Sequence, residues 1–330
     1  MSKIIRLNRN ENPYPPLEKI IEAAKKGLTN LNRYPDTEDI DNLRRMLSVY
    51  TNVKENNLFL GSGFYSLIMQ VINLFSRKGK IVTVDPTLSF PTRTMYDLET
   101  KLLKIKICEP LFSLPITPLI NELKDADLVF IDNPNNPTGS LLLYGGSVDD
   151  LCNSTDGVVL IDEAYYEFSH FSVVDIVKDH GNLAVIRTMS KAFGLAGLRI
   201  GYMIAGETVA KKFSNKTLPF TLSKPSVYAA IEALKDTDYM SENVELILKE
   251  RERVREEASQ IGVKAYQSNT NFLLMRTSIP YISRKLREFG IMVADLSGHL
   301  PPEFIRVSIG TREENDALLD ALRKLVESNC

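Results

Sequence analysis

The segment RTMSKAFGLAGLRIGY, residues 187–202, places one lysine among small and apolar residues. Lys191 is followed by Ala, Phe, Gly, Leu and Ala, so the local sequence offers its amine little solvation. Burial disfavours the ammonium form and lowers the pKa of a lysine. A neutral amine can attack a carbonyl and form a Schiff base. The alternative is a structural lysine at a strand end that reaches out to water. The other polar clusters of the sequence distinguish this alternative from a Schiff-base lysine.

An acidic residue follows a second apolar strand. Asp162 comes directly after GVVLI, and a carboxylate at the mouth of a buried strand needs a cationic or N–H partner. A protonated pyridine nitrogen is such a partner, and a helix N-cap or a metal ligand are the alternatives. VVLIDEA also resembles the Walker B strand of an ATPase. The chain has no G-x-x-x-x-G-K-[ST] segment, however, so a P-loop is excluded.

Groups that bind a phosphorylated ring lie near these two residues. Ser190 and Arg199 flank the lysine, and Ser62-Gly63 precede an apolar helix. A helix N-terminus, a hydroxyl and an arginine together favour a phosphate. Asn136 lies in the Pro-rich turn NPNNPTG, from which it can donate to a phenolate or carboxylate oxygen. Together these groups indicate a phosphorylated pyridine aldehyde, pyridoxal 5′-phosphate.

Short apolar segments with polar loops after them would position these residues. Such segments, buried on both faces, are typical of a mostly parallel sheet covered by helices. Parallel strands bring the residues at their carboxyl ends to one crevice. We expect strands at NLFL, KIVTVDP, KLLKIKI, ADLVFIDNP, GVVLIDEAY, NLAVIRTMS and RIGYMIAG.

The pattern changes after about residue 230, where a long charged helix precedes TNFLLMR, GIMVADL, FIRVSIG and a last helix. This predicts a small α+β domain. We expect residues 1–29 to form an arm that joins it, residues 30–225 a large cofactor-binding domain and residues 226–330 the small domain.

Composition excludes several classes of protein. The 330 residues carry a net charge of −2, which gives no electrostatic reason to bind nucleic acid or an anionic membrane surface. Three scattered cysteines suggest a reducing compartment, and no apolar run is long enough to span a bilayer. We therefore expect a cytoplasmic protein. His170, His180 and His299 lack metal-ligand spacing, so we predict no metal and surface or capping roles for them.

The motifs SKAFGLAGLRIGY, DNPNNPTG and LIDEAYYEF resemble those of the class-II, fold-type-I pyridoxal-phosphate aminotransferases. The resemblance extends from LNRNENPYPP and NRYPD to SNTNFLLMR and IRVSIGTREEN, and is strongest to the members that act on histidinol phosphate. It implies a large domain with a mostly parallel seven-stranded sheet, a small α+β domain and a homodimer. It also implies glutamate and 2-oxoglutarate as co-substrates.

The resemblance further implies roles for single residues. Lys191 would hold the cofactor and move the proton, Asp162 would pair with the ring nitrogen, and Tyr165 and Asn136 would hydrogen-bond the ring oxygen. Arg306 would clamp the substrate carboxylate, whereas Arg276 and Tyr14 would contact a distal phosphate. The cofactor phosphate would lie near Ser190, Arg199, Thr188, Ser62, the N–H of Gly63, and Tyr34 from the partner subunit.

Two positions depart from the family pattern. Gly63 is followed by Phe64 where the family has an acidic pair, so only a backbone N–H role carries over. Leu88 stands where an aromatic residue stacks on the ring, so either Leu88 gives a looser apolar contact or Phe90 takes its place.

Three other functions fit parts of the pattern. An aromatic amino-acid aminotransferase and a decarboxylase of an amino-acid phosphate, such as threonine phosphate, would share the scaffold. A binding protein without turnover would share the fold, but it would have no need for the set of Lys191, Asp162 and Asn136.

Overall fold

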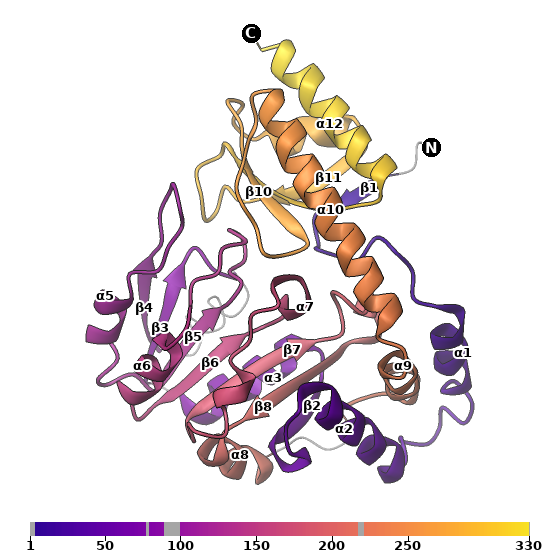
Figure 1. Ribbon diagram of the computed structural model, residues 1–330, viewed down its shortest axis with the longest axis vertical. Coiled ribbons are helices and arrows are strands. Elements are labelled where there is room, and N and C mark those ends of the chain that lie inside the picture. The colour runs from indigo at the N-terminus through magenta and orange to yellow at the C-terminus, as the bar shows by residue number, and fades with distance from the viewer. Residues whose placement is uncertain (1–3, 77–78, 89–99, 217–220, 330) are drawn as a thin grey trace.

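The apolar segments of the first two thirds of the chain form one seven-stranded sheet (Figure 1). The computed structural model describes residues 4–76, 79–88, 100–216 and 221–329. Phe90 lies outside them. The strand order is β2-β8-β7-β6-β5-β3-β4. The strands are β2 (Leu58–Ser62), β3 (Lys80–Asp85), β4 (Lys101–Lys106), β5 (Leu128–Asp132), β6 (Val158–Asp162), β7 (Leu183–Thr188) and β8 (Ile200–Ala205).

One strand of this sheet runs against the others. β8 is antiparallel to both β7 and β2, whereas β3 to β7 pair in parallel. The carboxyl ends of β2, β5, β6 and β7 therefore meet at one edge, and β8 begins there. This arrangement brings Ser62, Asp162, Thr188 and Arg199 to the same edge, as the parallel pattern predicts.

Helices cover both faces of the sheet, because every residue of β5 to β8 is buried. No helix within the described ranges is both long and apolar enough to cross a membrane. The helices are α2 (Thr37–Thr51), α3 (Phe64–Phe75), α5 (Ile116–Asn121), α6 (Ser147–Asn153), α7 (Tyr166–Ser169), α8 (Glu207–Ser214) and α9 (Lys224–Leu234).

A second, five-stranded sheet has the order β1-β11-β12-β10-β9 and is accompanied by α10 and α12, seen in orange and yellow in Figure 1. A capping box between Thr311 and Glu314 begins α12. The elements are β1 (Ile5–Leu7), β9 (Lys264–Ala265), β10 (Phe272–Arg276), β11 (Ile291–Asp295), β12 (Phe304–Ser308), α10 (Asp238–Gln260), α11 (Ile282–Glu288) and α12 (Arg312–Glu327).

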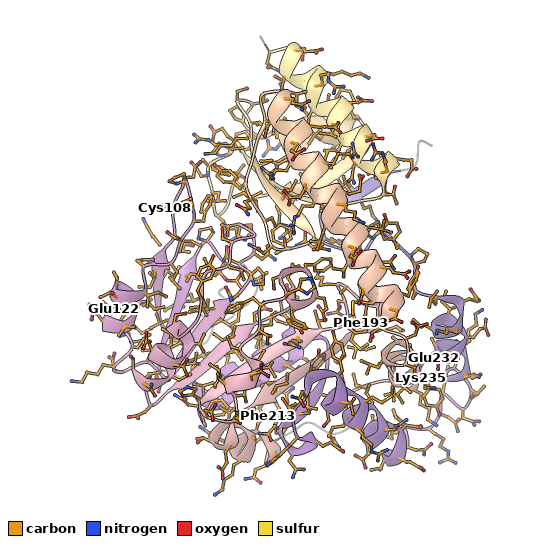
Figure 2. The ribbon with its side chains drawn as sticks, viewed as in Figure 1. Cys108, Glu122, Phe193, Phe213, Glu232 and Lys235 are labelled. Atoms are coloured by element: carbon orange, nitrogen blue, oxygen red, sulfur yellow. The ribbon has the colours of Figure 1, made fainter. Side chains whose placement is uncertain are left out.

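The N-terminal arm connects the two sheets. β1 pairs in parallel with β11, and α1 (Glu18–Lys26) packs on α9. We propose domain boundaries after residue 29 and after residue 225, the second of which falls at the start of α9. Phe193, in the lysine loop and labelled in Figure 2, packs edge to face on Tyr50 of α2 with the ring centres 5.6 Å apart, which ties that loop to the large domain.

Candidate active site

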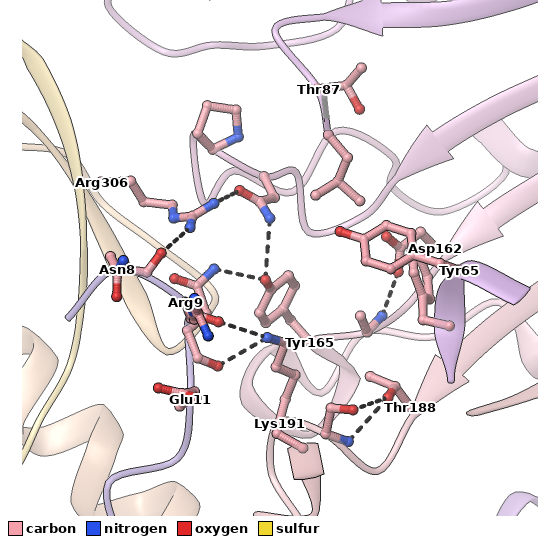
Figure 3. Close-up of a pocket in the computed structure, with 18 of the residues that line it drawn as sticks. Asn8, Arg9, Glu11, Tyr65, Thr87, Asp162, Tyr165, Thr188, Lys191 and Arg306 are labelled. Atoms are coloured by element: carbon pink, nitrogen blue, oxygen red, sulfur yellow. Dashed lines mark hydrogen bonds between the residues drawn. The ribbon is translucent and has the colours of Figure 1, made fainter. Parts of the chain in front are cut away.

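A cavity of about 640 Å³ opens at the edge where the strands end (Figure 3). Its volume lies within the ordinary range for a small-molecule site. In Figure 3, Asp162 and Tyr65 lie on one side, Arg306 and Asn8 lie on the other, and Tyr165 and Lys191 lie between them. Nine of the predicted residues line this cavity: Lys191, Asp162, Tyr165, Asn136, Ser190, Arg199, Thr188, Leu88 and Arg306.

Asp162 ends β6 and is 2% exposed. Its Oδ1 accepts a hydrogen bond of 2.8 Å from the N–H of Ala164, whereas its Oδ2 is buried without a partner. Burial, and then the negative charge of Asp132, raise the pKa of Asp162 well above its ordinary value. With Oδ2 free, this carboxyl group is suited to pair with a nitrogen base, with which it can share its proton.

Lys191 lies in the loop that follows β7. Its Nζ donates to the carbonyl oxygens of Arg9 and Asn10, each at 3.1 Å. Burial, together with the positive charge of Arg306, lowers the pKa of Lys191 to about 8. The amine is therefore available as a neutral nucleophile or base close to neutral pH, as the apolar sequence around it predicts.

A hydrogen-bonded group joins the amide of Asn136 to Tyr165 and Arg306. The Tyr165 hydroxyl accepts hydrogen bonds from Nδ2 of Asn10 at 2.9 Å and from Nδ2 of Asn136 at 3.3 Å. Oδ1 of Asn136 accepts from Nη1 of Arg306 at 2.5 Å. These contacts fix the side chains of Asn136 and Tyr165 at the cavity wall.

Arg306 projects from β12 into the cavity. Its Nη2 donates to the carbonyl oxygen of Asn8 at 2.9 Å, and its Nε is buried without a partner. Burial lowers the pKa of this guanidinium, which nevertheless stays charged. A buried guanidinium with N–H capacity to spare is suited to bind an anion.

The groups predicted to bind phosphate gather around Arg199, whose φ of 53° is left-handed. Gly63 has a φ of 77°, which favours glycine, and a Cβ there would lie 2.6 Å from Nη2 of Arg199. Thr188 Oγ1 donates to Ser190 Oγ at 2.9 Å. Phe64 begins α3 and lines the cavity, and N–H groups in the first turn of a helix have no intrahelical acceptor.

Five predicted residues do not line this cavity in the described part of the chain. The N–H of Gly63 already donates to the carbonyl oxygen of Gly61 at 2.8 Å. Arg276 forms an ion pair of 2.9 Å with Glu109. The others are Ser62, which is exposed at the end of β2, Tyr14, which borders a neighbouring hollow, and Tyr34, which is 67% exposed.

The sequence analysis missed several lining residues. Asn8, Arg9, Asn10 and Glu11 of the arm cover the lysine side of the cavity. His299, predicted to be a surface or capping residue, also lines it. A run of polar residues directly after β1 was the available signal for the arm. Within the described ranges, no cluster of three metal-ligating side chains occurs.

The low pKa of Lys191 predicts a specific dependence of stability on pH. Below about pH 8 the folded, cofactor-free protein carries a buried ammonium group. Between about pH 8 and the ordinary lysine pKa of 10.5, only the unfolded chain keeps that proton, so the free energy of unfolding rises with pH. Relative to Lys191→Met, the wild type should gain about 1–3 kcal/mol across this range.

Urea denaturation of both proteins from pH 7 to 10 measures this difference. Lys249→Met, on the exposed face of α10, is the matched control, and its free energy of unfolding should differ from that of the wild type by the same amount at every pH. A constant difference between wild type and Lys191→Met would contradict the burial argument.

Comparisons with known proteins agree with this geometry. The family model described as aminotransferase class I and II matches residues 2–322. The histidinol-phosphate aminotransferase 2 of Archaeoglobus fulgidus is 36% identical, and the match covers 98% of this chain and 93% of that protein. The crystal structure of the histidinol-phosphate aminotransferase from Clostridium acetobutylicum has a TM-score of 0.90 and 27% identity, and the match covers 98% of this chain and 100% of that one.

A structure with the cofactor is also similar. It is the histidinol-phosphate aminotransferase from Sinorhizobium meliloti in complex with pyridoxal-5′-phosphate. Its TM-score is 0.89 at 26% identity, and the match covers 99% of this chain and 92% of that chain.

Proposed function

Because the chain belongs to the aminotransferase class I and II family, we propose that it transfers the amino group of histidinol phosphate to 2-oxoglutarate. The products are imidazole-acetol phosphate and glutamate. The observation that carries the reaction type is the presence of Lys191, Asp162 and Arg306 in one cavity. The full-length similarity to histidinol-phosphate aminotransferases supports the choice of substrate.

The residues present fit pyridoxal phosphate. The unpartnered Oδ2 of Asp162 matches a ring N–H, and Lys191 offers an amine in the same cavity. Arg199, Ser190 and the start of α3 match its phosphate. When bound, this cofactor supplies an electron-withdrawing ring that takes up the electron pair left when the substrate loses its Cα proton.

The protein's own groups then divide the work. Lys191 would hold the cofactor and would accept the proton that leaves Cα of the substrate. Asp162 would pair with the ring nitrogen, while Asn136 and Tyr165 would hold the ring oxygen. The guanidinium of Arg306 binds the carboxylate of glutamate or 2-oxoglutarate through two parallel hydrogen bonds. This bidentate contact orients the Cα–H bond.

Three residues outside the cavity keep their predicted roles as proposals. Arg276 lies two residues beyond Leu274, the register partner of Arg306, so both arginines lie on the same face of the sheet. Release from Glu109 would free it for the distal phosphate, with Tyr14 as a second contact. The exposed Tyr34 would reach the cavity of a second subunit in a homodimer, which sedimentation of the purified protein tests.

The substrate proposal predicts a clear order among amino donors. With pyridoxal phosphate and 2-oxoglutarate, we expect glutamate to form from histidinol phosphate at a kcat/KM at least about a hundredfold above that with phenylalanine or tyrosine. A site built for a charged group loses that much when the group is absent. A glutamate assay over this panel of donors makes the measurement.

Two results would overturn this choice. Glutamate formed from phenylalanine or tyrosine but not from histidinol phosphate would favour an aromatic aminotransferase. Release of carbon dioxide from threonine phosphate without glutamate would favour a decarboxylase.

A further inference from the structure

A second buried carboxylate lies beside Asp162. Asp132 ends β5 as Asp162 ends β6, and the two residues are partners in the parallel register. Neighbouring strands are about 4.8 Å apart, and paired residues project from the same face of a sheet. Asp132 is 0% exposed and does not line the cavity, so its carboxylate lies behind the cavity wall.

The hydrogen bonds of Asp132 favour its ionised form. Its Oδ1 accepts from Oγ1 of Thr87 at 2.9 Å and from Nδ2 of Asn135 at 2.8 Å. Its Oδ2 accepts from the N–H of Asn136 at 2.8 Å. All three partners donate, and an ionised carboxylate offers acceptor lone pairs on both oxygens to match them.

These bonds also connect Asp132 to the cavity wall. Thr87 and Asn136 both line the cavity, and Thr87 directly precedes Leu88. One carboxylate therefore fixes the loop after β3 and the loop after β5 relative to the end of β6.

The electrostatic balance of the pair favours a proton at Asp162. The pKa of Asp132 is raised by burial and lowered by its three donors, which leaves it at about 6. The other charges that act on Asp162 are those of Glu163 and Lys191, and Glu163 is itself paired with Arg187 at 2.8 Å. Asp132 is thus largely ionised at neutral pH, and its charge opposes the loss of a proton from its neighbour.

We propose that Asp132 is a positioning residue that makes the Asp162 side of the cavity selective for a ring nitrogen that carries a proton. It does so as a second negative charge behind Asp162, held there by Thr87, Asn135 and Asn136. When the ring binds, the proton held at Asp162 is shared with or passed to the ring nitrogen, and Asp132 keeps it in the site. The inference rests on the use of pyridoxal phosphate and not on the identity of the amino donor.

Cofactor binding to the cofactor-free protein tests this proposal. Dissociation constants are measured by absorbance for pyridoxal phosphate and for the analogue in which a C–H group replaces the ring nitrogen. Asp132→Asn should lower the preference for pyridoxal phosphate over the analogue by about tenfold or more. The reason is that each pKa unit lost at the site corresponds to a factor of ten in the affinity for the proton. The analogue itself should bind this variant with a nearly unchanged dissociation constant.

Thr87→Ser is the matched control, because it changes the side chain at the cavity wall but keeps the hydroxyl that donates to Asp132 and so leaves the charge of Asp132 in place. It should change the affinity for both ligands by the same factor, so the preference is unchanged. An unchanged preference in folded Asp132→Asn overturns the proposal. If that variant does not fold, Asp132→Ser removes the same charge with a smaller side chain. It should show the same loss of preference, and an unchanged preference would again overturn the proposal. None of these measurements involves histidinol phosphate, so a different amino donor leaves them valid.

Discussion

Lys191→Ala is expected to lower kcat by at least about 10²–10⁴-fold, the usual contribution of a positioned acid–base group. The loss follows from two properties of this side chain. Its amine is buried in the cavity, and its pKa of about 8 makes it both a nucleophile and a base near neutral pH. Alanine supplies neither function. Steady-state assays with histidinol phosphate and 2-oxoglutarate measure kcat, and the absorbance of the bound cofactor reports the lost covalent attachment.

Partial recovery separates a missing base from a damaged fold. A small amine such as methylamine, added at high concentration, should restore part of the turnover of Lys191→Ala, because it can enter the vacated space and accept the proton. Lys249→Ala, on the exposed face of α10, is the control and should keep wild-type kcat. Turnover within tenfold of wild type in Lys191→Ala would contradict the proposed role and favour a different base.

Arg306→Ala is expected to raise the KM for 2-oxoglutarate by about 10²–10⁴-fold. Each hydrogen bond to a charged group is worth about 1.5–3 kcal/mol, and the guanidinium can make two to one carboxylate. Arg306 is only partly exposed at the cavity wall, so water replaces these bonds incompletely. Initial rates over a range of 2-oxoglutarate concentrations measure the effect.

Two further variants interpret that result. Arg306→Lys keeps the charge but not the planar fork, and should recover only part of the affinity. Arg312→Ala removes an exposed arginine of α12 that pairs with Glu250, and should leave KM unchanged. Since Arg306 also donates to Asn136 and Asn8, thermal unfolding must show that Arg306→Ala stays folded. A folded Arg306→Ala with wild-type KM would place the carboxylate elsewhere.

The convergence of Lys191 and Asp162 followed from the sequence for a physical reason. Apolar strands buried on both faces must pair under a cover of helices, and parallel pairing brings their carboxyl ends to one edge. The antiparallel β8 fits the same rule, because its amino end lies at the edge where the parallel strands have their carboxyl ends. Arg199 directly precedes β8 and therefore lies at that edge.

The contacts that sequence reasoning missed depend on pairings between distant segments. The arm reaches Lys191 only because β1 pairs with β11, nearly three hundred residues later in the chain. Arg276, predicted to contact a distal phosphate, forms an ion pair with Glu109, which lies 167 residues earlier in the chain. Likewise, DNPNNPTG shows Asp132 but cannot show that it is the register partner of Asp162.

The central claim is that Lys191 and Asp162 hold one molecule of pyridoxal phosphate between them. Reduction of the cofactor-loaded protein with borohydride, followed by proteolysis and mass spectrometry, tests it most directly. The account predicts one phosphopyridoxyl group per chain, on Lys191. A label on another lysine, or a Lys191 that stays unmodified in protein saturated with the cofactor, would contradict it.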